Sequence, residues 1–156
     1  VWLVAPQNPL KTTDGMAEYR RRLDSAAREA RHPRMTISDI EQRLESRYTF
    51  DTIAALRRRY PRARFVWLMG GDSFLSFHRW KDWQGILRAV PIAILPRPGS
   101  SLAAAKSVAG RRMARAMVPS SLARSLPDAK PPAWTVLAAE LDKRSSTAIR
   151  KRGEWP

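Results

Sequence analysis

The chain has 156 residues, 44% of them apolar, which is enough to form the core of one compact domain. It contains no cysteine and only two histidines, far apart in the sequence, so disulfides, cysteine nucleophiles and zinc sites are excluded. Its apolar runs are shorter than the about eighteen residues that a membrane-spanning helix needs, and we expect a cytoplasmic protein.

The formal charge of +15 comes from 29 Lys and Arg against 14 Asp and Glu, so the surface attracts polyanions. The arginines are spread through segments such as EYRRRLDSAAREAR and AALRRRYPRAR, a pattern that is typical of solvated helix faces. Nucleic acid is therefore not the expected partner. An anionic nucleotide would gain from the same field without any duplex being bound.

Short apolar runs alternate with amphipathic stretches in the first part of the chain. We expect a strand over Val1 to Val4, a helix over 15–31 with apolar residues at three- and four-residue intervals, and a short strand over 35–40. Thr49 is predicted to be the N-cap of a further helix, with Asp51 in its first turn and Pro61 just beyond its end.

Three apolar runs in the rest of the chain predict strands. Phe65 to Met69 is apolar on consecutive positions, as expected of a strand covered on both faces, and Pro91 to Leu95 and Trp134 to Leu137 repeat that signature. Within the looser segment 98–132 we expect one helix, over 104–117. Strands that alternate with helices predict an α/β fold with an open parallel sheet.

Polar loops follow the predicted strands at the sheet edge where such folds bind ligands, namely NPLK, GGDS, RPG and, after a short acidic link, RSSTAIR. Gly70 and Gly71 would permit a close backbone approach or a positive φ. Asp72 would begin the next helix and accept hydrogen bonds from ribose hydroxyls. Trp80 and Trp83, three residues apart, would share a helical face, with Trp83 in the core and Trp80 exposed to stack on a flat heterocycle.

The RSSTAIR segment has the composition of a phosphate site. Its hydroxyl residues would cap a helix whose first N–H groups point at a phosphate, and Arg150 lies one turn after Ser146 and Thr147. The alternative is a simple capping run followed by a solvated arginine.

The ordered set PQNPLK, SRYTFDTI, GGDSFLSFHRWKDWQGI, RPG and SSTAIR resembles bacterial nicotinate-nucleotide adenylyltransferases, enzymes of the nucleotidyltransferase superfamily. The resemblance runs over nearly the whole chain. It implies one nucleotidyltransferase domain over residues 1–156, with a Rossmann-like open parallel sheet and helices on both faces. It also implies transfer of AMP from ATP to nicotinate mononucleotide, giving deamido-NAD and pyrophosphate. Magnesium would arrive with ATP, and no tightly bound cofactor is expected.

The resemblance implies roles for individual residues. Thr49, Asp72, Trp80 and Arg97 would bind nicotinate mononucleotide, with Thr49 and its helix N-terminus near the nicotinate carboxylate and Trp80 on the ring. Thr49 has the alternative of being a cap and nothing more, and Arg97 that of a turn residue before proline. The ATP phosphates would be bound by Lys11, Ser146, Thr147 and Arg150.

The sequence departs from the family pattern at its beginning. A glycine-rich turn and a His-x-Gly-His pair open the family sequence, and this chain contains neither, so we identify no catalytic residue. His32 and His78 do not replace the pair, whose charge stabilises the leaving pyrophosphate. Because Val1 aligns with the family's second strand, we expect a chain that is incomplete at the N-terminus, less stable than an extended form and impaired in catalysis.

Two other functions stay open from the sequence: a related adenylyltransferase with another phosphorylated acceptor, and a basic RNA-binding module with stacking tryptophans. The sequence leaves undecided whether the protein is a monomer or a homo-oligomer, and whether the acid or the amide mononucleotide is preferred.

Overall fold

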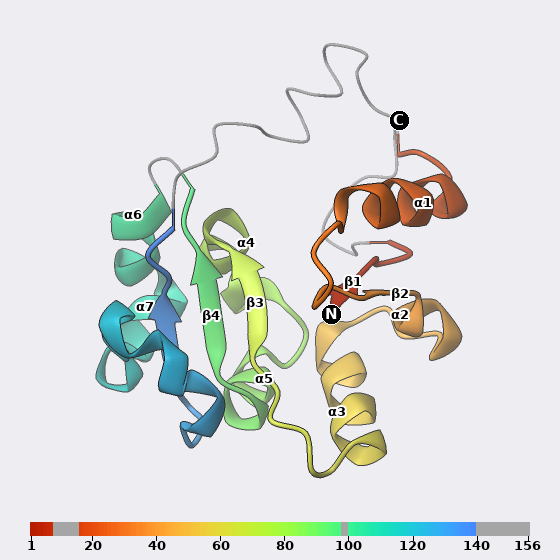
Figure 1. Cartoon of the computed structure of the whole chain (residues 1–156). Coiled ribbons are helices and arrows are strands. Elements are labelled where there is room, and N and C mark those ends of the chain that lie inside the picture. Colours follow the sequence, from red (N-terminus) through yellow and green to blue (C-terminus); the bar gives the residue numbers. More distant parts are fainter. Residues whose placement is uncertain (8–15, 98–99, 140–156) are drawn as a thin grey trace. The chain divides into compact units, whose positions relative to one another are not determined.

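The computed structural model describes residues 1–7, 16–97 and 100–139 (Figure 1). The chain divides into two compact units, with the border between Thr52 and Ile53. Each unit is described by itself, and the expectation of one domain over residues 1–156 stays a prediction.

The first unit contains a two-stranded parallel sheet and short helices. Strand β1 (Trp2–Leu3) pairs with β2 (Ile37–Ser38), so that Trp2 lies opposite Ile37. Helix α1 (Tyr19–Glu29) lies between them in sequence, and α2 (Ile40–Arg43) and the start of α3 (Thr49–Arg59) follow. The predicted elements are therefore confirmed, although β1, α1 and β2 are shorter than expected and the short helix α2 was not predicted.

The second unit is built on a three-stranded parallel sheet in which β3 (Trp67–Gly70), β4 (Ile92–Leu95) and β5 (Trp134–Val136) are neighbours in chain order (Figure 1). Its helical elements are α4 (Gly71–Leu75), η1 (Phe77–Arg79), α5 (Trp83–Ala89), α6 (Ser100–Lys106), α7 (Val108–Arg112), η2 (Ala114–Ala116) and η3 (Ser120–Asp128). β4 and β5 lie within the segments where the apolar runs predicted them, and β3 extends one residue beyond its predicted run, to Gly70.

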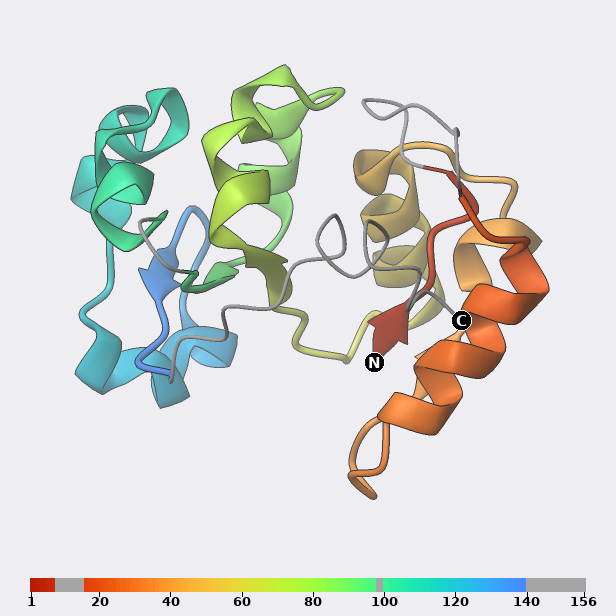
Figure 2. The ribbon, with the colours of Figure 1, turned by 90° about the horizontal axis from the view of Figure 1, so that it is seen from above.

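Helical segments cover both faces of this sheet (Figure 2). On one face the Trp134 ring stacks on Phe74 of α4 at 5.2 Å between ring centroids, and Phe74 stacks in turn on Phe77. On the other face Ala93 packs with Leu126 of η3. Because side chains alternate between the faces of a strand, the consecutive apolar residues of β4 serve both layers.

The α/β class with open parallel sheets is confirmed. The described strands nevertheless form two sheets rather than one, because β3 pairs with β4 alone among the described residues. One prediction about β3 is wrong. The apolar run predicts a strand covered on both faces, but Leu68 is 56% exposed, so the face of β3 that carries Leu68 is not covered by the described residues. No helix among the described residues is long and apolar enough to cross a membrane.

The single helix predicted over 104–117 is also wrong. The chain turns at Ser107, whose hydroxyl donates to the carbonyl of Ala104 at 2.7 Å and accepts from the N–H of Gly110 at 3.0 Å, which starts α7 in a new direction. A Cβ on Gly110 would lie 2.2 Å from the Ala104 carbonyl oxygen, so only glycine fits at this crossing. The side-chain hydrogen bonds of Ser107 thus take the place of a continued helix at this position.

Candidate functional site

An ion pair joins the ends of two neighbouring strands in the second unit. Asp72 lies in the first turn of α4, directly after β3, and Arg97 follows β4. The Arg97 Nη1 atom donates to Asp72 Oδ2 at 3.0 Å, with both side chains largely exposed. Within the described residues, Oδ1 of Asp72 has no hydrogen-bond partner, so this oxygen can accept a bond from a ligand. The structure thus brings together two of the predicted site residues.

Gly70 lies beneath this pair and differs from the expectation. Its φ is −72°, which any residue adopts, so positive φ is not the reason for glycine here. An added Cβ would lie 3.6 Å from both Arg97 Nε and Asp72 Oδ1. The absent side chain therefore leaves the surface beside both charges uncovered, which favours a close approach by a ligand.

Trp80 and Trp83 do not share a helical face, and this prediction is wrong. The helical turn η1 ends at Arg79, and α5 begins at Trp83 after Asp82, which has a positive φ of 42° and caps α5 by accepting from the Gly85 N–H at 3.0 Å. Both tryptophan rings form T-shaped contacts with the Phe77 ring, with 5.4 Å between ring centroids for Trp80 and 5.9 Å for Trp83. Each is half-buried, so Trp80 is less exposed, and Trp83 less buried, than expected.

Thr49 belongs to the first unit. It was predicted to be the N-cap, the residue just before the helix, but it is the first residue of α3 itself. Close behind it lies a buried polar cluster that the sequence did not reveal. The Thr52 hydroxyl, fully buried, donates to Glu41 Oε1 at 3.1 Å and lies 2.8 Å from the Ser46 hydroxyl. Burial raises the pKa of Glu41, and the Thr52 hydrogen bond opposes part of that rise.

A second set of contacts missed in the sequence holds the segment after β1. The Arg22 guanidinium on α1 donates to the carbonyls of Ala5 and Pro6, each at 2.7 Å, and to that of Ala17 at 3.1 Å. Tyr19 donates to the Val4 carbonyl at 3.1 Å, and burial raises the pKa of its phenol. The side chains of α1 thus fix the path of the chain towards the predicted phosphate-binding loop.

Four predicted phosphate ligands, Lys11, Ser146, Thr147 and Arg150, lie outside the described residues. Their assignment stays a prediction. The two histidines are both described: His32 Nδ1 accepts from the backbone N–H of Arg34 at 3.2 Å, and His78 Nδ1 is buried without a hydrogen-bond partner in the described part of the chain. No three His, Asp or Glu side chains gather as metal ligands among residues 1–7, 16–97 and 100–139.

Comparison with known proteins adds a second kind of observation. A model of the cytidylyltransferase-like family matches residues 1–152. Proteins called probable nicotinate-nucleotide adenylyltransferase from Cereibacter sphaeroides, a Caulobacter species and a Ruegeria species are 51%, 49% and 47% identical to this chain. The chain belongs to the nicotinate-nucleotide adenylyltransferase family. The matches cover 97–99% of this chain and 80–81% of those members of the family, so the resemblance first seen in five short motifs extends through the helices and strands between them.

Proposed function

We propose that the protein transfers the adenylyl group of ATP to nicotinate mononucleotide, forming deamido-NAD and pyrophosphate in NAD biosynthesis. The observation that carries the proposal is the 51% identity, over 99% of the chain, to a protein called probable nicotinate-nucleotide adenylyltransferase. Neither the RNA-binding module nor another phosphorylated acceptor is favoured, because the relatives share one name. A cytoplasmic location is part of the proposal.

In this proposal Asp72, Arg97 and Trp80 bind the mononucleotide. Arg97 holds one carboxylate oxygen of Asp72, and the other oxygen is directed to a ribose hydroxyl. Trp80 is supported from behind by the Phe77 ring, so its position is fixed while part of its surface is still exposed. Thr49 at the start of α3 offers its hydroxyl and first-turn N–H groups to the nicotinate carboxylate.

The reaction asks little covalent chemistry of the protein. A phosphate oxygen of nicotinate mononucleotide attacks the α-phosphorus of ATP. The bond from that phosphorus to the oxygen that bridges the α- and β-phosphates breaks as pyrophosphate leaves. No general base is needed because the attacking phosphate is already ionised. The protein aligns the two substrates and neutralises charge, and Lys11, Ser146, Thr147 and Arg150 are the residues we propose for the ATP phosphates. Magnesium enters this reaction as part of the MgATP substrate.

Ligand-dependent melting separates substrate binding from catalysis and therefore tests the proposal even if turnover is weak. Nicotinate mononucleotide should raise the melting temperature of the full chain, and deamido-NAD should appear when MgATP is added. Trp80→Leu should weaken mononucleotide binding about tenfold, since stacking on one base is worth roughly 1–3 kcal/mol.

Trp83→Leu is the matched control for this substitution, because Trp83 also forms a T-shaped contact with the Phe77 ring and loses a comparable contact. If both variants lose binding equally, Trp80 has no specific role. If the mononucleotide gives no stabilisation while single-stranded RNA binds in a salt-dependent way, the proposed function itself is wrong.

A further inference from the structure

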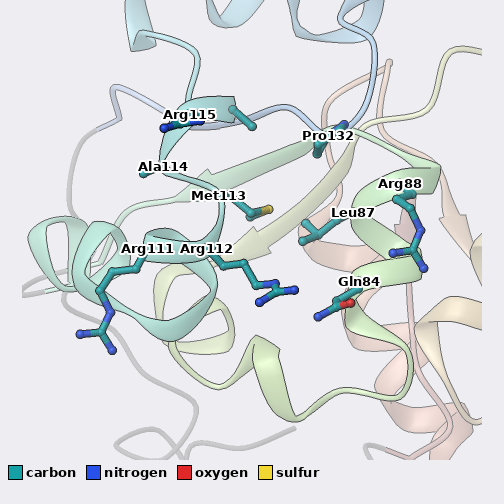
Figure 3. Close-up of a pocket in the computed structure, with 10 residues that line it drawn as sticks. Gln84, Leu87, Arg88, Arg111, Arg112, Met113, Ala114, Arg115 and Pro132 are labelled. Atoms are coloured by element: carbon teal, nitrogen blue, oxygen red, sulfur yellow. The ribbon is translucent and has the colours of Figure 1, made fainter.

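A basic cavity of about 600 Å³ lies between α5 and α7 in the second unit (Figure 3). Its walls come from Gln84, Leu87 and Arg88 on α5, and from the segment 111–116 with Pro132. Arg88 comes just before β4 and Pro132 just before β5, so the cavity lies towards the amino ends of these strands. The Asp72–Arg97 pair lies at the carboxyl ends, which are the opposite edge of the sheet.

The charge around this cavity is of one sign. Among the described residues that line it, four are arginines and none is acidic; the arginines are Arg88, Arg111, Arg112 and Arg115. Among the described residues, Arg88 alone of these four has a carboxylate within ion-pair distance: its Nη2 atom lies 3.9 Å from Asp82 Oδ1. Within the described part of the chain, Arg111, Arg112 and Arg115 form no ion pair.

The geometry of the cavity suits a ligand with both charge and an apolar body. Figure 3 shows the side chains of Arg112 and Gln84 extending towards each other, with Arg88 on the Gln84 side. The Leu87 and Met113 side chains point towards one another and give the cavity an apolar wall. A volume of this size lies within the range of roughly 300–1,000 Å³ found for small-molecule sites.

A simpler explanation covers part of this pattern. Arg88 is in the last turn of α5, and Arg111 and Arg112 are in the last turn of α7, where cations complement the helix dipole. The same explanation holds for Arg57 and Arg58 in the last turn of α3. It accounts for each arginine singly, but it does not account for an acid-free cavity shared by arginines of two helices.

We propose that this cavity is a second nucleotide-binding site, which takes a nucleoside carrying two or more phosphates through Arg88 and Arg112. Guanidinium groups would form charge-assisted hydrogen bonds with phosphate oxygens, and the Gln84 amide would add a neutral donor. The nucleoside would lie against Leu87 and Met113. This site is separate from the residues proposed for the mononucleotide, so the two proposals succeed or fail independently.

Trp134 provides a reporter for this site. Its side chain is 1% exposed, and its indole Nε1–H donates to the carbonyl of Met113, a cavity residue, at 2.8 Å. A ligand that contacts Met113 should therefore move the Trp134 indole resonance in a two-dimensional NMR spectrum of the full chain. Titration with ADP should move it saturably, whereas adenosine, which lacks phosphate, should leave it in place.

The double variant Arg88→Ala/Arg112→Ala should weaken the ADP response of Trp134 at least tenfold. Arg57→Ala/Arg58→Ala is the matched control, because it removes the same charge from the last turn of another helix with exposed arginines. That control should keep the ADP affinity of the parent chain. If both variants bound ADP equally weakly, the loss of affinity would come from the lower net charge alone, and the proposal would be overturned. It would also be overturned if the resonance did not move with millimolar ADP, or moved only with RNA.

Discussion

At the scale of single residues, Arg22 joins three separate points of the backbone in the first unit. Its guanidinium donates to three backbone carbonyls and lies 5.3 Å from the centre of the Tyr19 ring. The guanidinium presents its donors in a rigid planar fork, and the compact ammonium group of lysine does not reproduce this geometry. The identity of this residue, and not only its charge, is therefore what stabilises the segment after β1.

Arg22→Lys keeps the charge and should lower the free energy of unfolding by about 2 kcal/mol, because hydrogen bonds from a charged group to backbone are lost. Chemical denaturation would measure the change. Arg20→Lys on the same helix is the control: Arg20 is exposed and forms an i,i+4 ion pair with Asp24, at 3.5 Å, so its replacement should change stability by less than about 0.5 kcal/mol. Equal effects of the two substitutions would contradict this interpretation.

Glu41 links the first unit to pH. Burial makes its carboxyl bind a proton more tightly in the folded than in the unfolded chain, where the ordinary pKa is 4.5. Below that pH both states are protonated and the contribution to stability is fully present. It is lost as the pH rises from 4.5 through the raised pKa, because the folded chain must then carry a buried charge.

Glu41→Gln should remove this loss. The variant should melt a few degrees above the parent chain at pH 8, and the difference should shrink as the pH falls towards 4.5. Thermal melts across this pH range would show it. Glu29→Gln, at an exposed position of α1, makes the same charge change without burial. A constant difference at all pH values would contradict the assignment.

At the scale of elements, the crossing of α6 and α7 depends on Gly110, which has no Cβ atom. Gly110→Ala would normally favour a helix, since alanine forms helices better than glycine by roughly 1 kcal/mol. Here the new methyl group would lie 2.2 Å from the Ala104 carbonyl oxygen and 2.7 Å from that of Ala105, both of them backbone atoms. We expect a loss of about 1–3 kcal/mol of stability, measured by denaturation.

Ala105→Ser is the control for this substitution, since it adds one atom at an exposed position of α6, beside the same crossing. It should leave stability nearly unchanged. A stabilised Gly110→Ala variant would show that the crossing can open without cost.

The sequence predicted the strands well and the helix boundaries less well, for a physical reason. A strand buried on two faces leaves a run of apolar residues that is visible without neighbours, as in β4 and β5. The breaks before α5 and α7 depend on Asp82 and Ser107, each of which accepts from a glycine N–H three residues later. That capping signal is present in the sequence as an Asp or Ser three residues before a Gly.

The candidate site was predictable in its position but not in its contacts. The rule that ligands bind at the carboxyl ends of parallel strands placed Asp72 and Arg97 on one rim. Their ion pair spans 25 residues, and the cluster of Glu41 with Thr52 spans 11, so both depend on how the chain folds back. Local pattern carries no information about such pairs.

At the scale of the whole molecule, the net charge of +15 should affect ligand affinity. The proposed substrates are both anionic, and added salt shortens the screening length from about 10 Å at 0.1 M to about 3 Å at 1 M. The dissociation constant of nicotinate mononucleotide should therefore rise several-fold between 0.1 and 0.5 M sodium chloride. Calorimetry would measure it, with nicotinate riboside, which lacks the phosphate, as the comparison. Equal salt dependence of the two ligands would contradict a role for phosphate attraction.

The border between the two compact units falls inside α3, between Thr52 and Ile53. Thr52 bonds to Glu41 and Ser46 in the first unit, and the next side chain, Ile53, is only 3% exposed in the second. Recombinant fragments cut at that border would divide α3 after its first turn. The buried residues Thr52 and Ile53 would then become chain ends. Anyone dissecting the protein should therefore give both fragments an overlapping copy of α3.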